Sequence, residues 1–144
     1  MKILVLNGPN LNLLGAREPE VYGDLNLEAL KNKLEKRAAE LGVTCELRQT
    51  NSEDERIGWI HEAFTNQLPV ILNPAAFTHY SYALRDACAA HTKSGNKLIE
   101  VHISNPHSRE VFRHTSVISA VATGVIAGFG FDSYLLALEQ LSRN

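Results

Sequence analysis

The chain has 144 residues, of which 44% are hydrophobic and 21% are charged, and this is typical of one soluble domain. Fourteen Lys and Arg residues against sixteen Asp and Glu residues leave a formal net charge of −2, without the basic excess that binding to a phosphate backbone requires. The two cysteines, Cys45 and Cys88, are too few for a disulfide scaffold and lack the spacing of zinc ligands. We therefore expect a single domain over residues 1–144, with reduced cysteines and no nucleic-acid partner.

The apolar segments predict neither a signal peptide nor a membrane span. The N-terminal apolar run is short and ends at Asn7-Gly-Pro9, which is too early for a signal peptide. The longest apolar stretch near the C-terminus, residues 117–131, is interrupted by Ser, Thr and Gly, and it is shorter than the roughly 20 residues that span a bilayer. We expect a cytoplasmic protein that has no membrane partner.

The first half of the chain alternates strand and helix patterns. An apolar run at Ile3–Leu6 predicts a first strand, and an apolar stripe from Leu27 to Leu41 predicts a helix that Gly42 can end in a left-handed conformation. A weaker apolar run follows at Val43–Leu47. The segment Ser52-Glu-Asp-Glu55 has the pattern of a capping box that begins a second helix. The expected buried stripe of that helix is Ile57, Ile60 and Phe64.

The second half continues the alternation. Apolar runs at Leu68–Leu72, Leu98–Ile103 and Val121–Ala127 predict three more strands. Thr78 or Ser81 can cap a third helix, which runs through Ala83, Leu84, Ala87 and Cys88, and Asp132 can cap a last helix, which runs through Leu135, Leu138 and Leu141. Strands that are apolar on both faces favour a parallel sheet covered on both sides. The predicted fold is α/β, a flavodoxin-like three-layer sandwich with a five-stranded parallel sheet.

Polar residues follow several of the predicted strands, and in such a fold they meet at the edge where ligands bind. Glu100 and His102 are two residues apart on one strand, so their side chains point to the same face, and the carboxylate can orient the imidazole. This pair has the chemistry of an acid and base site. The alternative is a structural pair of polar residues, but a charged pair inside a parallel sheet is costly unless it faces a wet cleft.

A polar loop with glycine at each end, residues 15–23, has the pattern of a segment that closes over a ligand. It contains Arg17 and Tyr22, and a nearby guanidinium stabilises the ionised form of a tyrosine, whose ordinary pKa is about 10. Taken alone, the loop is more simply read as an ordinary surface loop with a packed tyrosine.

Three further basic residues are candidate ligand contacts near the fourth strand and the third helix. Arg109 and Arg113 follow the fourth strand and can hold carboxylate or hydroxyl oxygens, or else are solvated charges. His79 precedes the third helix and can bind a hydroxyl or take a structural place in the cap. The histidines have no metal-ligand spacing, and the glycines form neither of the common nucleotide-binding loops, so we expect no metal site and no such loop.

Several segments together resemble the type II 3-dehydroquinate dehydratases. These segments are Asn7-Gly-Pro-Asn-Leu-Asn-Leu-Leu-Gly15, Arg17-Glu-Pro, Tyr22-Gly23, Asn73-Pro-Ala-Ala-Phe-Thr-His79, Ala83-Leu-Arg-Asp86, Glu100-Val-His102-Ile-Ser-Asn105 and Phe112-Arg-His114. They cover nearly the whole chain, in order and at the spacing of that family. The resemblance implies a flavodoxin-like fold, a dodecamer built as a tetramer of trimers, and cofactor-free conversion of 3-dehydroquinate to 3-dehydroshikimate and water, in the shikimate pathway or in quinate catabolism.

The resemblance also implies roles for individual residues in an anti elimination through an enolate. Tyr22, as a phenolate supported by Arg17, would remove the proton next to the ketone; Asn10 would stabilise the enolate; and His102, oriented by Glu100, would protonate the departing hydroxyl. Asn73 and the backbone at Ile103 and Ser104 would hold the substrate carboxylate, His79 and Arg113 would hold the ring hydroxyls, and Asp86 would reach the site of a neighbouring subunit.

The chain departs from the family pattern at Asp54, Arg56, Thr115 and Ser133, and none of these is an expected catalytic position. Two other functions stay open at this point. A flavodoxin-like module that binds a small carboxylate without turnover would use the same arginines and asparagines, but it would have no need for both Tyr22 and His102. A purely structural oligomerising domain would bind no small ligand.

Overall fold

A five-stranded parallel sheet forms the centre of the computed structural model, which describes residues 1–16, 20 and 26–143. The strands are β1 (Lys2–Asn7), β2 (Thr44–Gln49), β3 (Val70–Asn73), β4 (Leu98–His102) and β5 (Gly124–Ala127). Their order in the sheet is β2-β1-β3-β4-β5, and every neighbouring pair is parallel. This order is that of flavodoxin-like folds, so the predicted fold class is confirmed.

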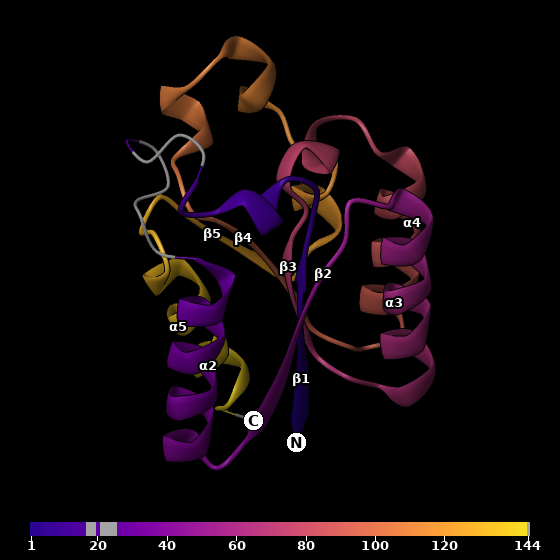
Figure 1. The fold of residues 1–144 in the computed structure, drawn as a ribbon. Coiled ribbons are helices and arrows are strands. Elements are labelled where there is room, and N and C mark those ends of the chain that lie inside the picture. The colour runs from indigo at the N-terminus through magenta and orange to yellow at the C-terminus, as the bar shows by residue number, and fades with distance from the viewer. Residues whose placement is uncertain (17–19, 21–25, 144) are drawn as a thin grey trace.

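Two pairs of helices cover the two faces of the sheet (Figure 1). Helices α2 (Leu27–Leu41) and α5 (Asp132–Leu141) lie on one face, and α3 (Glu53–Asn66) and α4 (Tyr82–Lys93) lie on the other. Alternate residues of β1 serve the two cores: Ile3 packs on the side of α2 and α5, and Leu4 packs on the side of α3 and α4. The three layers thus follow from strands that are apolar on both faces.

Side-chain caps begin three of the helices. Asn26 accepts a hydrogen bond from Ala29 N at the start of α2, and Ser81 accepts one from Leu84 N at the start of α4. Ser52 accepts one from Glu55 N at 3.1 Å, but its own amide donates to Thr50 Oγ1, so only half of the predicted capping box forms. Gly42 ends α2 with a φ of 75°, as its lack of a Cβ allows.

Two predictions about helices are wrong in detail. The buried stripe of α3 is Arg56, Ile60 and Ala63, so the helix is rotated from the predicted stripe and Phe64 is 44% exposed. Asp132 is the first residue of α5 and not its cap. A capping carboxylate at Asp132 would accept from the amide of Tyr134 or Leu135, but both of these amides donate to the carbonyl of Phe131.

Two strands begin two or more residues later than predicted. The fifth strand begins at Gly124, because the short helix η5 (Ser119–Val121) occupies the beginning of the apolar run. The third strand begins at Val70, because Leu68 N still binds the carbonyl of Ala63 at the end of α3. Apolar character alone does not distinguish these turns from strands.

Short helical turns lie at the carboxyl edge of the sheet (Figure 1). They are η1 (Leu11–Leu13), η2 (Ala75–His79), η3 (Pro106–Ser108) and η4 (Val111–His114). Each of the turns η1, η2 and η3 follows shortly after a strand, so these turns place the predicted polar residues together. Within the part of the chain that the structure describes, no helix is long and apolar enough to cross a membrane.

Candidate active site

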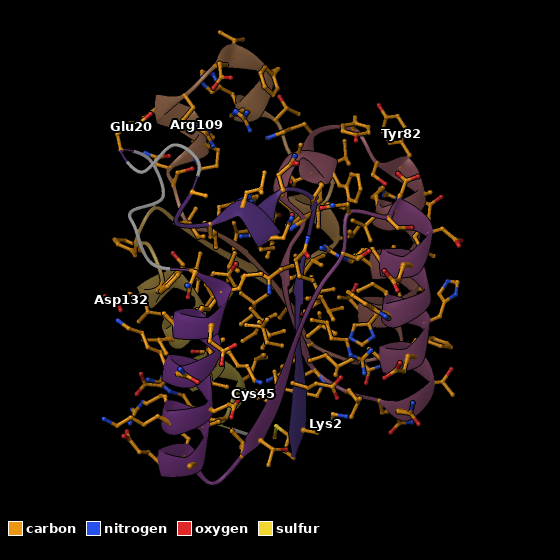
Figure 2. The ribbon with its side chains drawn as sticks, viewed as in Figure 1. Lys2, Glu20, Cys45, Tyr82, Arg109 and Asp132 are labelled. Atoms are coloured by element: carbon orange, nitrogen blue, oxygen red, sulfur yellow. The ribbon has the colours of Figure 1, made fainter. Side chains whose placement is uncertain are left out.

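A pocket opens at the carboxyl edge of the sheet, among the turns that follow β1, β3 and β4. Its described lining is Pro9, Asn10, Leu11, Asn73, Ala75, Ala76, His79, His102, Ile103, Ser104, Pro106, Arg109 and Arg113. Figure 2 shows Arg109 at this end of the molecule, far from Lys2 and Cys45 at the opposite end. The pocket has a volume of about 610 Å³, including space open to solvent, which suits a small organic ligand.

Glu100 lies under this pocket as a fully buried carboxylate with several hydrogen-bond donors. Thr78 Oγ1 donates at 2.6 Å, Ser119 Oγ at 2.6 Å and Ser116 Oγ at 3.1 Å. His102 Nε2 lies 2.5 Å from Glu100 Oε2. Burial by itself would raise the pKa of Glu100, but the hydrogen bonds from His102, Ser119 and Thr78 and the charge of His102 hold the pKa below its ordinary value. Glu100 is therefore ionised at neutral pH.

This carboxylate decides which nitrogen of His102 faces which group. An ionised carboxylate only accepts hydrogen bonds. Nε2 of His102 therefore carries a hydrogen and donates a hydrogen bond to Glu100. Nδ1 is then the ring nitrogen available to a ligand. The His102 side chain is 12% exposed and lines the pocket, so Glu100 orients an imidazole that a bound molecule can reach.

Asn73 is held at the pocket wall by a buried network. Its Nδ2 donates to Tyr134 Oη at 2.8 Å, and Tyr134 Oη donates to Asn7 Oδ1 at 2.6 Å. Burial raises the pKa of Tyr134, so the phenol keeps its proton. Ala75 N donates to Asn73 Oδ1 at 3.0 Å. These bonds fix the amide of Asn73 in one orientation.

Two residues in the lining adopt left-handed backbone conformations. Asn10 has a φ of 69° and Ala75 a φ of 52°. Asparagine tolerates this region, whereas for alanine it stores strain of about 1 kcal/mol or more. Asn10 N donates to Asn51 Oδ1 at 3.0 Å, which ties the turn after β1 to the loop after β2.

His79 and Arg113 form a further part of the pocket lining. His79 Nδ1 lies 2.8 Å from the carbonyl of Thr115, so it donates there and Nε2 is left as an acceptor. Burial lowers the pKa of His79, with a smaller lowering by Arg113. Arg113 stacks on the Phe112 ring and donates from Nε to Glu110 at 3.0 Å.

The last side of the pocket follows β4. Ile103 and Ser104 continue the chain directly beyond His102. Arg109 Nη1 donates to Ser104 Oγ at 3.3 Å, which connects this turn to η3. Arg109, a candidate ligand contact from the sequence, thus lies in the pocket lining beyond β4.

The structure gathers most of the residues that the resemblance singled out. In the pocket lie Asn10, Asn73, His79, His102, Ile103, Ser104 and Arg113, with Glu100 beneath them. Asp86 does not line this pocket: its side chain is 75% exposed on α4 and pairs with Arg85 at 2.9 Å. Arg17 and Tyr22 lie outside the described residues.

The sequence analysis missed the hydroxyl groups that hold Glu100. Thr78 has only the pattern of a helix cap in the sequence, and Ser116 and Ser119 belong to no pattern that identifies them. Of the four departures from the family pattern, Asp54 is exposed and Ser133 accepts the bond from Phe129 N. Thr115 contributes only its backbone carbonyl to His79. Arg56 is buried behind the pocket wall.

The described residues form no group suited to bind a metal ion, and they place no lysine in the pocket lining for an imine-forming mechanism. They contain no group of three or more His, Cys, Asp or Glu side chains that could hold a metal ion. All six lysines of the chain belong to the described part, and none is in the pocket lining. The ionisable groups around the pocket, His102 above all, are suited to proton transfer.

Comparison with known proteins agrees with this geometry. The family model described as Dehydroquinase class II matches residues 1–142. The chain is 57% identical to the 3-dehydroquinate dehydratase of Kineococcus radiotolerans, over 99% of this chain and 95% of that protein. It is 56% identical to the enzyme of the same name from Mycobacteroides abscessus, over 96% of this chain and 94% of that protein.

Solved structures give the same result. The structure of the type II dehydroquinase from Propionibacterium acnes matches with a TM-score of 0.95 and 49% identity, covering 99% of this chain and 97% of that one. A 3-dehydroquinate dehydratase-like protein from Bifidobacterium longum matches with a TM-score of 0.76 and 39% identity, covering 99% and 95%. With a family model that covers nearly its whole length, the chain belongs to the class II dehydroquinase family.

Proposed function

We propose that the protein is a type II 3-dehydroquinate dehydratase, a carbon–oxygen lyase of the shikimate pathway that converts 3-dehydroquinate to 3-dehydroshikimate and water. The observation that carries the proposal is the imidazole of His102, held in the pocket by the buried carboxylate of Glu100 at 2.5 Å. The family match favours this reaction over a binding module without turnover.

The acid of the reaction is His102. Elimination of water needs a proton on the departing hydroxyl, and an imidazole placed beside it can supply that proton. Since Nε2 donates to Glu100, the proton that is transferred comes from Nδ1, and Glu100 balances the positive charge of the doubly protonated ring. Glu100 contacts His102 but is not itself one of the residues that line the pocket, so it acts by positioning the acid.

The base of the reaction is Tyr22, activated as a phenolate by Arg17. Both lie outside the described residues, and their assignment rests on the resemblance of Arg17-Glu-Pro and Tyr22-Gly23 to the family. Removal of the proton next to the ketone leaves an enolate, whose oxygen Asn10 stabilises from the turn after β1. The anti elimination releases water, and exchange with solvent restores the proton to His102 and removes it from Tyr22.

The rest of the pocket binds the substrate. Asn73 and the backbone at Ile103 and Ser104 hold the carboxylate. His79 accepts a hydrogen bond from a ring hydroxyl through Nε2, and Arg113 donates to another. The fixed amide of Asn73 and the bond from His79 to Thr115 support these roles, since both side chains are held in place before a ligand arrives.

The proposal extends to the assembly and the setting of the enzyme. Asp86 contacts the site of a neighbouring subunit in a dodecamer built as a tetramer of trimers, and its exposure away from its own pocket supports that role. Each subunit is a single catalytic domain over residues 1–144, works in the cytoplasm, and needs no cofactor or metal.

Absorbance spectroscopy tests the proposed function. The product has a conjugated double bond and absorbs in the ultraviolet where the substrate does not, so the protein is mixed with 3-dehydroquinate in the presence of a chelator. We expect the absorbance to rise, and to rise equally after borohydride treatment of enzyme with ligand. No rise, with binding of the ligand still measurable, would instead indicate a small-carboxylate binding module.

A further inference from the structure

Arg56 is buried at the start of α3, and most of its guanidinium has no hydrogen-bond partner. The side chain is 0% exposed. Nη1 donates to the carbonyl of Asn73 over 3.4 Å, a long bond, and the buried Nε and Nη2 have no partner among the described residues. A buried guanidinium with so few partners destabilises a fold. Its presence therefore calls for an explanation other than stability.

The guanidinium lies directly behind one wall of the candidate active site. A Cβ added to Gly8 would lie 2.9 Å from Arg56 Nη2 and 2.6 Å from the Pro74 carbonyl oxygen, so only glycine allows these groups to approach. The carbonyl of Asn73 accepts both Gly8 N at 2.9 Å and Arg56 Nη1. Asn73 and Pro9 then line the pocket itself, one residue layer in front of the charge.

No anion among the described residues compensates the charge of Arg56. Burial lowers the pKa of Arg56 to about 10, and the guanidinium is still protonated at neutral pH. The ionisable groups that act on it are Cys88 and Tyr134. Burial raises the pKa of both, so neither is an anion. Across the described ranges, no carboxylate forms an ion pair with Arg56.

We propose that Arg56 is a positioning residue that raises the affinity of the pocket for the carboxylate of the substrate, and this inference rests on the function proposed above. The interior screens charge weakly, so a cation one layer behind the wall attracts an anion in the pocket. Its bond to the Asn73 carbonyl also holds in place a residue that lines the pocket. Both effects act on substrate binding, and neither acts on the chemical step.

Substitution of Arg56 separates this role from a structural one. Arg56→Leu removes the charge. Arg56→Met also removes it but keeps a long unbranched side chain. If one of these neutral variants fails to fold, the other serves the test. Arg56→Lys keeps the charge and loses the planar fork. The matched control is Arg37→Leu, which removes the same charge from α2, where Arg37 is partly exposed and paired with Glu40 and Glu139.

For the neutral variants we expect KM for 3-dehydroquinate to rise about tenfold, with kcat changed less than about twofold. Their melting temperature should be equal to or above that of the wild type, because a buried unpaired charge is gone. Arg56→Lys should raise KM less than about threefold, and Arg37→Leu should leave KM unchanged. A structural role would change stability without this division between KM and kcat.

A substrate analogue with a carboxamide in place of the carboxylate identifies the group that Arg56 acts on. The neutral variants should lose affinity for the carboxylate and keep their affinity for the carboxamide. The role of Arg56 would be overturned if the neutral variants lost equal affinity for both ligands, or if their KM for 3-dehydroquinate stayed within about twofold of the wild-type value. Wild-type protein without turnover would overturn the proposed function, and this outcome is distinguished by assaying the wild type first.

Discussion

Glu100 and Arg56 are both fully buried charged residues beside the same pocket, yet their surroundings are opposite. The carboxylate of Glu100 is surrounded by three hydroxyl groups and the ring of His102. Among the described residues, the guanidinium of Arg56 forms one long hydrogen bond. A buried charge that is fully hydrogen-bonded orients its neighbours, whereas one that is not bonded leaves its field to act on whatever binds nearby.

This comparison predicts opposite effects on stability. Removing the charge of Glu100 leaves donors without an acceptor and destabilises the fold. Removing the charge of Arg56 takes away an uncompensated ion and does not.

The largest expected effect is on the acid itself. His102→Ala should lower kcat about 10³-fold, because no other group supplies the proton to the departing hydroxyl. Initial rates at saturating 3-dehydroquinate measure this loss. The control is His61→Ala, since His61 is exposed on α3 and does not line the pocket. A His102→Ala variant with near-normal turnover would show that the acid is another group.

The residue that positions the acid comes next. Glu100→Gln should lower kcat about 10²-fold, since an amide cannot balance a protonated His102, and it should lower the free energy of unfolding by about 2–3 kcal/mol. Urea denaturation measures the second effect. If the variant were as stable as the wild type, the hydrogen bonds around Glu100 would not be the source of stability described above.

The contact between Gly8 and the region of Arg56 gives a smaller effect on stability. Gly8→Ala should lower the free energy of unfolding by about 2 kcal/mol, because the added methyl group meets the Pro74 carbonyl at 2.6 Å. Gly58→Ala is the matched control. Nothing lies within 4 Å of a Cβ at Gly58, in the interior of α3, so this substitution should stabilise by about 0.5–1 kcal/mol.

The smallest effect is the pH dependence that Glu100 contributes. Because its pKa in the folded state lies below the ordinary value of 4.5, the unfolded state takes up a proton first as the pH falls. The contribution of Glu100 to stability is therefore complete above about pH 4.5 and is lost as the pH falls through its folded-state pKa. The stability difference between wild type and Glu100→Gln should shrink on acidification below pH 4.5. A constant difference from pH 6 to pH 3 would contradict the lowered pKa.

Much of the fold could be predicted from local patterns in the sequence. The apolar stripe from Leu27 to Leu41 and its end at Gly42 were confirmed, because helix spacing and the cap both depend on nearby residues. The predicted start of the fifth strand was wrong. Val121 belongs to the short helix η5, and an apolar residue such as valine does not by itself distinguish a turn from a strand. The start of this strand depends on contacts with distant segments, such as the bond from Leu98 N to Thr123 Oγ1.

The site was predictable to a similar degree. Strand alternation placed Glu100 and His102 on one face, and the structure brings them within 2.5 Å. The hydroxyl groups that hold Glu100 come from turns far from it in sequence, so no local pattern identified them. The burial of Arg56 could likewise not be predicted, because an arginine in an amphipathic helix is ordinarily assigned to the exposed face.

The central claim is that Glu100 works through His102, and a double-mutant cycle of kcat tests it most directly. The four proteins are the wild type, His102→Ala, Glu100→Gln and the double variant, each assayed with saturating 3-dehydroquinate. If Glu100 serves only to position the acid, the double variant should have a kcat within about threefold of that of His102→Ala alone. Losses that multiply, to about 10⁵-fold in the double variant, would show two independent roles and contradict the account.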